Sequence, residues 1–229
     1  MSLLVPIDLS APSRCAIGLA AHIGRTTGED ALLLHVSDGP TPLDHLARLH
    51  ALASPLRDAG LVARLREVVG QPAENICLEA ERRAARWVIM GTRGDWGPAA
   101  PRDPGSVART VLARAPIPVI AVRPALARGD CWLVSGRPAH GREPRIGVVS
   151  LSGAPRPSMI ALAEGLAVAL SGRIVTRGEG DLSGMDLDLV IAERSDQPLD
   201  DLFGDALAAL RCPVAVVSAP ETPPPDAGR

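Results

Sequence analysis

The first half of the chain alternates short apolar runs with amphipathic segments, and this alternation constrains the fold more than any other feature. Continuous apolar runs separated by helical segments are typical of a parallel sheet with helices on both faces. The predicted strands are residues 3–7, 31–36, 61–69, 87–91 and 116–122. The first predicted helix begins at Ser10, and the next three span 42–59, 70–86 and 106–115. The sequence therefore predicts an α/β fold.

Local signals refine this order. Ser10 is expected to cap the first helix, and Pro55 to kink or split the second helical segment. Arginines on one side of residues 61–69 favour an edge position for that strand. Pro116 and Pro118 place the last strand either at an edge or at its own start.

The pattern restarts after residue 144 in a shorter form. Predicted strands at 145–152, 172–176, 188–192 and 212–217 accompany predicted helices at 157–170 and 199–210. Residues 88–90 (Val-Ile-Met) match 190–192 (Val-Ile-Ala), and residues 118–122 match 213–217. The gap between 176 and 188 has no room for a helix–strand–helix unit, so we expect a truncated copy that lacks its edge strand.

The repeated pattern of strands and helices divides the chain into four parts. A complete domain spans 1–124, a connector spans 125–144, a truncated and degenerate copy spans 145–219, and residues 220–229 form a proline-rich tail that is predicted to be disordered. Residues 131–134 (Cys-Trp-Leu-Val) could form a further short strand within the connector.

Lysine is absent, so all 24 basic residues are arginine. This absence excludes a P-loop, a Schiff-base mechanism and a protein kinase, because each depends on a lysine. A phospho-aspartate receiver would also normally carry a lysine. An aromatic content of 2% is too low for a platform that stacks single-stranded nucleic acid. The net charge of −2 also argues against a nucleic-acid partner.

No apolar run approaches the roughly 18 residues of a membrane span, and the first residues lack the basic start of a signal peptide. The cysteines, Cys15, Cys77, Cys131 and Cys212, are scattered and form no C-x-x-C pair. We therefore expect free thiols in a cytoplasmic protein without a membrane partner, with Cys15, Cys77 and Cys212 buried as small apolar side chains.

Several predicted strands end in residues suited to binding a ligand. Asp8 follows the first strand, Val36 ends the second, and Met90 and Gly91 end the fourth, while Gly105 precedes the helix that follows. In an open α/β sheet, ligands bind at the carboxyl ends of the strands. Glycines there allow the backbone to approach a phosphate, and a helix N-terminus offers N–H groups and a positive dipole. Such a site needs no lysine.

These segments resemble the universal stress protein family. The resemblance rests on residues 5–10 (Val-Pro-Ile-Asp-Leu-Ser), on Gly70-Gln71-Pro72 with Ile76, on 88–94 (Val-Ile-Met-Gly-Thr-Arg-Gly), on 105–108 (Gly-Ser-Val-Ala) and on 118–122 (Pro-Val-Ile-Ala-Val). It covers nearly all of residues 1–124, and 145–219 more weakly. It implies a flavodoxin-like fold (adenine nucleotide α hydrolase-like), with a parallel five-stranded sheet of order 3-2-1-4-5.

The resemblance also implies a function: a bacterial regulatory protein of the stress response that binds ATP, with or without Mg²⁺, or a related adenine nucleotide, in its first domain only. Adenine and ribose would contact Asp8, Val36, Met90 and Gly91, and phosphates would contact Gly94, Gly105, Ser106 and Val107. Pro6, Ile7 and Arg93 complete the implied nucleotide site. The strands from Pro118 to Val122 and from Pro213 to Val217 would pair as an intramolecular pseudo-dimer, and a further homodimer stays open.

Two departures from the family pattern bear on this function. Ten residues lie between Gly94 and Gly105, one more than in the ATP-binding pattern, and they include the acids Asp95 and Asp103. In the second half Ser150 replaces Asp8. Acidic residues take the positions that correspond to Gly91, Gly94 and Gly105-Ser106 of the first half, namely Glu193, Asp196 and Asp200-Asp201. Carboxylates oppose phosphate, so the second half is not expected to bind nucleotide. Arg86 and Trp87 also depart from the pattern, but at the start of a strand rather than at the site.

Several alternatives stay open beside this function. Asp8 could serve only as a cap for the first helix, and residues 91–105 could be a linker without ligand, which would leave a scaffold that acts through protein contacts. An enzyme is not expected, beyond very slow ATP hydrolysis, because no nucleophile set or catalytic base is evident. His35 is expected to be a half-buried histidine with a satisfied hydrogen bond, and no metal site is expected at His45 and His50.

Overall fold

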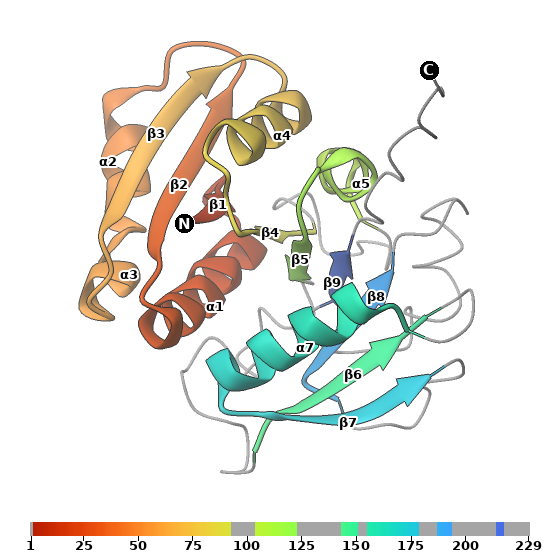
Figure 1. Cartoon of the computed structure of the whole chain (residues 1–229). Coiled ribbons are helices and arrows are strands. Elements are labelled where there is room, and N and C mark those ends of the chain that lie inside the picture. The colour runs from red at the N-terminus through yellow and green to blue at the C-terminus, as the bar shows by residue number, and fades with distance from the viewer. Residues whose placement is uncertain are drawn as a thin grey trace, which may run out of the picture.

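The computed structural model describes residues 2–92, 104–122, 143–150, 155–178, 187–193 and 214–217 (Figure 1). The elements of the first half are β1 (Ser2–Pro6), α1 (Ala11–Thr27), β2 (Asp30–Ser37), α2 (Leu43–Ala51), α3 (Ser54–Asp58), β3 (Ala63–Val69), α4 (Pro72–Arg82), β4 (Trp87–Gly91), α5 (Ser106–Arg114) and β5 (Val119–Val122). Those of the second half are β6 (Arg145–Val149), α7 (Pro157–Leu170), β7 (Arg173–Gly178), β8 (Leu189–Glu193) and β9 (Val214–Val217).

The strands form one nine-stranded sheet in the order β3-β2-β1-β4-β5-β9-β8-β6-β7. The first five strands run parallel, which confirms the flavodoxin-like order 3-2-1-4-5 predicted for the first half. Strand β5 then pairs antiparallel with β9, in the register Val119↔Val216 and Ala121↔Val214. This one antiparallel junction joins the two halves of the described sheet.

The second half repeats the strand order of the first in reverse direction along the sheet. Strands β9, β8, β6 and β7 are parallel to one another and occupy the places that β5, β4, β1 and β2 hold in the first half. Within the described residues no strand takes the place of β3, so β7 lies at the outer end of the sheet. Its origin as a truncated copy stays a prediction.

Two helical layers cover the sheet and define two core clusters. Strand residues alternate between them, so Leu3 and Val5 of β1 face one cluster and Leu4 faces the other. Helices α1, α2, α3 and α7 contribute to the first cluster, while α4 and α5 contribute to the second. Helices α1 and α7 contact each other across the junction (Figure 1), so the first cluster is continuous through both halves.

Most predicted boundaries agree with the structure. Ser10 caps α1 by accepting a hydrogen bond from the Ser13 N–H, and strand β3 lies at an edge. Pro55 splits the second helical segment, because α2 ends at Ala51 and α3 begins at Ser54. Strand β5 lies inside the sheet, so the alternative that its prolines mark an edge strand is wrong; they precede its start.

The third predicted helix is shorter than expected. Helix α4 ends at Arg82 rather than Arg86, because Ala84 takes a positive φ of 44° and the Arg86 N–H already bonds the Ser2 carbonyl beside the sheet. The predicted helix 199–210, the short strand 131–134 and the tail lie outside the described residues.

Of the cysteines expected to be buried, the structure buries Cys15 but not Cys77. Cys15 is buried, and this burial raises the pKa of its thiol. Cys77 is half-buried, whereas Cys131 and Cys212 fall outside the described segments. Across the described residues, none of the helices combines the length and the apolar character that a bilayer crossing requires.

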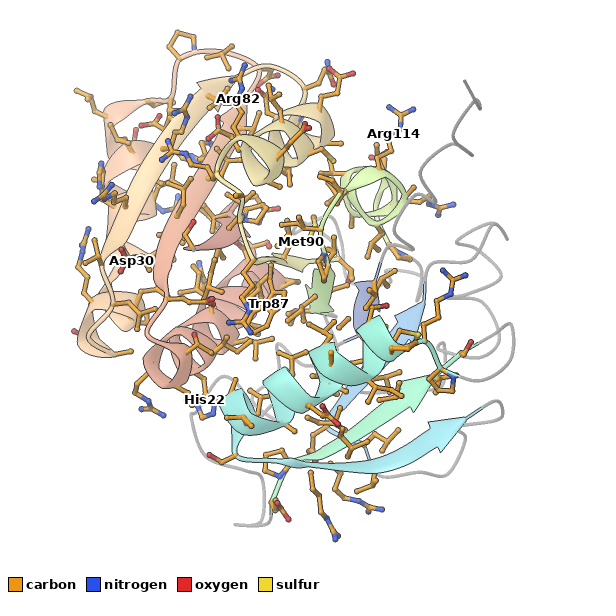
Figure 2. The ribbon with its side chains drawn as sticks, in the orientation of Figure 1. His22, Asp30, Arg82, Trp87, Met90 and Arg114 are labelled. Carbon is orange, nitrogen blue, oxygen red and sulfur yellow. The ribbon has the colours of Figure 1, made fainter. Side chains whose placement is uncertain are left out.

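Trp87 is the first residue of β4 and lies at the end of the strand away from Met90 (Figure 2), and Arg86 precedes it in the chain. The Trp87 ring is 1% exposed and belongs to the core cluster beneath α1 and α7. The Arg86 guanidinium lies 4.6 Å from the ring centroid, and its Nη1 lies 3.0 Å from Oε1 of Glu29. Both departures from the family pattern therefore affect packing at the start of the strand.

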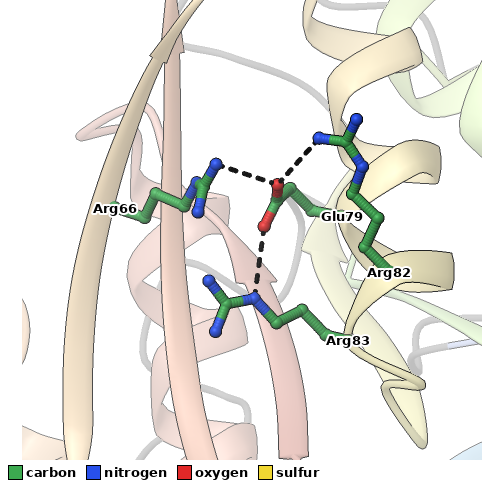
Figure 3. A network of polar contacts seen from close by, with 4 residues as sticks. All are labelled: Arg66, Glu79, Arg82 and Arg83. Atoms are coloured by element: carbon green, nitrogen blue, oxygen red, sulfur yellow. Dashed lines mark hydrogen bonds and ion pairs between the residues drawn. The ribbon is translucent and has the colours of Figure 1, made fainter.

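A buried carboxylate on α4 pairs with three arginines (Figure 3). Glu79 Oε1 lies 3.3 Å from Nη2 of Arg66 on β3 and 4.0 Å from Nη1 of Arg82, and its Oε2 lies 3.4 Å from Nε of Arg83. The Glu79 side chain is 4% exposed, whereas those of the arginines are 40–61% exposed. This cluster ties α4 to the edge strand.

Replacing Glu79 by glutamine is expected to lower the free energy of unfolding by about 1–2 kcal/mol, because the substitution removes the buried negative charge that pairs with the three arginines; the loss stays modest because the exposed arginines can be hydrated. Urea denaturation measures the change. Glu81→Gln is the matched control, since Glu81 is an exposed glutamate on the same helix, and it should change stability by less than about 0.5 kcal/mol. Equal effects of the two substitutions would contradict a role for the cluster.

Candidate functional site

A pocket opens where β1, β2 and β4 end and α4 and α5 begin. Its cavity volume is about 280 Å³. Nine of the predicted site residues line it: Pro6, Ile7, Asp8, Val36, Met90, Gly91, Gly105, Ser106 and Val107. The other two, Arg93 and Gly94, lie outside the described residues. The structure thus brings together every predicted site residue that it describes.

Five further residues that were not predicted as site residues also line the pocket: Ser13, Leu34, Pro72, Thr92 and Ala108. Leu34 lies two positions before Val36 in β2, so the period of a strand could have identified it. Ser13, Pro72 and Ala108 belong to the first turns of α1, α4 and α5. They reach the pocket because helices that follow parallel strands begin at the same edge of the sheet.

The turn after β1 presents Asp8 to the pocket. The exposed Asp8 side chain accepts, through Oδ1, a hydrogen bond from the Ser10 N–H at 3.1 Å. Ser10 in turn caps α1 through the Ser13 N–H at 3.2 Å. The side chain that caps α1 is therefore that of Ser10, and Asp8 supports the turn with one oxygen. Among the described residues no partner is recorded for its other oxygen, Oδ2, which suits a role as an acceptor for a ligand.

Gly91 sits where β4 passes close to α1. A Cβ atom at this position would lie 2.7 Å from the Pro12 Cβ and 3.2 Å from the Ser13 nitrogen. Any side chain here would push the first turn of α1 away from β4. This glycine therefore allows β4 and the first turn of α1 to pack directly against each other beside the pocket.

Backbone bonds hold together the ends of the long loop after β4. The Thr92 N–H bonds the Val122 carbonyl at 2.9 Å, and the Gly105 N–H bonds the Thr92 carbonyl at 2.7 Å. Thr92 Oγ1 also donates to the Val122 carbonyl. The loop, whose sequence is one residue longer than the family pattern, therefore starts and ends at points that lie side by side at the pocket.

The electrostatic character of the pocket comes from helix ends. Gly105 at the start of α5 and Gln71 at the start of α4 make no side-chain capping bond, in contrast to Ser10 at α1. An uncapped helix N-terminus has backbone N–H groups to offer and carries a partial positive charge. Asp8 is the one charged side chain among the described lining residues. Such a pocket suits a ligand with an anionic end and a hydroxyl donor.

His35 lies behind the pocket wall. Its Nδ1 is 3.0 Å from the Ile7 carbonyl oxygen, which confirms the expected hydrogen bond, but at 8% exposure the side chain is buried rather than half-buried. Its ring centroid lies 5.3 Å from that of His45 on α2. In the described part of the chain no group of three or more metal-ligating side chains occurs.

The corresponding place in the second half has little in common with this pocket. Ser150, which follows β6 as Asp8 follows β1, is 1% exposed. Glu193 ends β8 where Gly91 ends β4. Asp196 and Asp200-Asp201 lie outside the described residues, so the expected absence of a second nucleotide site stays a prediction.

Comparison with known proteins agrees with this fold. The model of the universal stress protein family matches residues 1–123. Because this match spans more than half of the 229 residues, the chain belongs to the universal stress protein family. A search of curated proteins finds no match.

Solved structures share the fold. A functionally unknown protein from Pseudomonas aeruginosa PAO1 is 15% identical, with a TM-score of 0.68, over 96% of this chain and 92% of that one. A universal stress protein from Archaeoglobus fulgidus DSM 4304 is 14% identical, with a TM-score of 0.58, over 95% and 96% of the two chains. Both alignments extend through the two halves, and at these identities they show the fold alone.

A third structure is a complex. The universal stress protein from Archaeoglobus fulgidus in complex with dAMP is 24% identical to this chain, with a TM-score of 0.44, over 53% of this chain and 97% of that one. Its alignment is thus confined to about half of the present chain.

Proposed function

We propose that this chain is a cytoplasmic regulatory protein that binds ATP or a related adenine nucleotide in the pocket of its first half, and that it is not an enzyme. The observation that carries this proposal is the uncapped N-terminus of α5, where Gly105, Ser106 and Val107 line the same cavity as Asp8. An anion is favoured at such a helix end, and a carboxylate such as Asp8 is a hydrogen-bond acceptor for a hydroxyl.

The lining residues fit the parts of a nucleotide. Val36, Met90 and the neighbouring Leu34 offer an apolar wall for a base. Asp8 would accept hydrogen bonds from ribose hydroxyls, and the N–H groups at the start of α5 would hold the phosphates. A volume of about 280 Å³ lies near the lower end of small-molecule pockets, which begin at about 300 Å³. Among the described residues no group of three or more His, Cys, Asp or Glu side chains gathers to hold a Mg²⁺ ion.

The second half would complete the assembly without binding nucleotide. Its β9 pairs with β5, and its α7 packs against α1, where a second protomer of a dimer would otherwise lie. The proposal includes a regulatory rather than a catalytic role. It is supported by the described lining residues, which include neither a histidine nor a cysteine. Any hydrolysis of a bound nucleotide would therefore be slow.

The test begins with purified full-length protein. Denaturation followed by mass spectrometry of the supernatant is expected to release an adenine nucleotide. Calorimetric titration of nucleotide-free protein with ATP, with and without Mg²⁺, is expected to give saturable binding at one site per chain. No released nucleotide together with no binding at millimolar ATP would overturn the proposal and favour a scaffold that acts through protein contacts.

A further inference from the structure

The peptide group that joins Ile7 to Asp8 is held from both sides by side chains. His35 donates through Nδ1–H to the Ile7 carbonyl oxygen at 3.0 Å, and the Asp8 N–H donates to Ser13 Oγ at 3.3 Å. The C=O and N–H of a trans peptide point in opposite directions. The two side chains therefore fix the plane of this one peptide group, and with it the direction in which the Asp8 side chain leaves the backbone.

The backbone around Asp8 needs such support. The Ile7 N–H bonds the Leu34 carbonyl at 2.9 Å, and beyond this bond the chain leaves the sheet. Leu9 then takes a positive φ of 65°, a conformation that costs an L-residue about 1–2 kcal/mol. A turn with this strain and without ladder bonds depends on its side-chain contacts to keep one conformation.

His35 acts from the opposite side of the sheet. Its neighbours in β2, Leu34 and Val36, line the pocket, so the alternation of the strand directs the His35 side chain to the other face. There it is buried beside the His45 ring of α2, and it is absent from the pocket lining. Its side chain is linked to the pocket by the hydrogen bond to the Ile7 carbonyl oxygen.

We propose that His35 is a positioning residue for the nucleotide site: by holding the Ile7–Asp8 peptide group against Ser13, it orients the Asp8 carboxylate toward the ribose hydroxyls of the ligand. This inference rests on the proposed nucleotide binding. The loss of the His35 bond leaves the peptide group held by Ser13 alone, and the direction of the Asp8 carboxylate then depends on the bond from the Ser10 N–H and on a less restrained backbone.

Two substitutions at His35 separate positioning from packing. Asparagine places an N–H₂ donor close to where Nδ1 of histidine lies, whereas leucine fills the space without a donor. We expect His35→Leu to weaken ATP binding about tenfold, the value of one well-oriented bond to a charged group. We expect His35→Asn to stay within about threefold of the parent affinity, since it keeps the donor. Urea denaturation of both variants checks that they fold.

A double-mutant cycle with Asp8→Ala decides whether the effect passes through Asp8. If His35 acts by orienting Asp8, His35→Leu costs no further affinity once the carboxylate is gone. Ser13→Ala removes the hydrogen bond on the other side of the same peptide group, and its effect on affinity should likewise depend on Asp8. This variant replaces His35→Leu in the cycle if His35→Leu does not fold.

Three results would overturn the inference. Equal affinities of the leucine and asparagine variants would remove the role of the donor. Additive losses with Asp8→Ala would mean that His35 acts elsewhere. Failure of the parent protein itself to bind ATP would instead overturn the proposed function, and the inference with it.

Discussion

Replacing Ser106 by glutamate is expected to lower nucleotide affinity by at least about 100-fold, because a new carboxylate near 4 Å from a phosphate charge costs about 4 kcal/mol at an effective dielectric constant of 20. Ser106 is the first residue of α5, is exposed, and lines the pocket. A glutamate at the start of a helix suits the helix dipole and favours folding. The substitution therefore separates binding from stability: affinity falls while the free energy of unfolding stays equal or rises slightly.

Thr110→Glu is the matched control, one turn further along the same helix and outside the described pocket lining. Titration calorimetry with ATP measures both variants against the parent, and urea denaturation confirms that each is folded. The control is expected to bind within about threefold of the parent, because its added charge lies about 5 Å further along the helix and outside the pocket lining, where the interaction with a phosphate falls with distance and with the higher dielectric constant of water. If the two variants bind equally well, phosphate does not lie at the N-terminus of α5.

Replacing Trp87 by alanine is expected to lower the free energy of unfolding by about 3–5 kcal/mol, the usual cost of truncating a large buried aromatic side chain. The ring is 1% exposed in the core cluster that α1 and α7 share. The substitution also removes the ring surface against which the Arg86 guanidinium lies. Because native domains are stable by about 5–15 kcal/mol, this loss is a large fraction of the total.

Trp87→Phe provides the control for this prediction. It keeps an aromatic ring in the core and is expected to cost clearly less than the alanine substitution, since most of the buried volume stays filled. Circular dichroism during urea denaturation measures both. Trp87 lies at the amino end of β4 and Met90 near the carboxyl end, so the folded fraction of either variant should bind nucleotide as the parent does. An alanine variant as stable as the parent would contradict the burial of this ring.

Elements bounded by strong local signals could be predicted from the sequence. Strand β4 has the predicted bounds 87–91, and α7 the predicted bounds 157–170, because apolar periodicity and a proline mark their ends. The end of α4 could not be predicted in this way. The positive φ of Ala84 and the bond from Arg86 to Ser2 of β1 are set by the return of the chain to the sheet, which is a tertiary requirement.

Some residues of the candidate site could likewise be predicted from local patterns, and others depend on tertiary packing. Asp8, Met90 and Gly105 could be predicted because they follow strands or precede a helix, and such positions share one edge of a parallel sheet. The contribution of Ser13 depends on how closely α1 approaches β4 beside Gly91, and no local pattern encodes that distance. Likewise the sequence predicts that His35 finds a partner, but not that the partner is a carbonyl 28 positions away.

The antiparallel pairing of β5 with β9 joins two strands of a single chain. Association that would otherwise be a bimolecular equilibrium is thereby an intramolecular one, governed by an effective concentration rather than by the amount of protein present. We therefore expect dilution to leave the two halves paired. The thermal midpoint of this junction should accordingly be independent of protein concentration, unlike that of a dimer built from separate subunits.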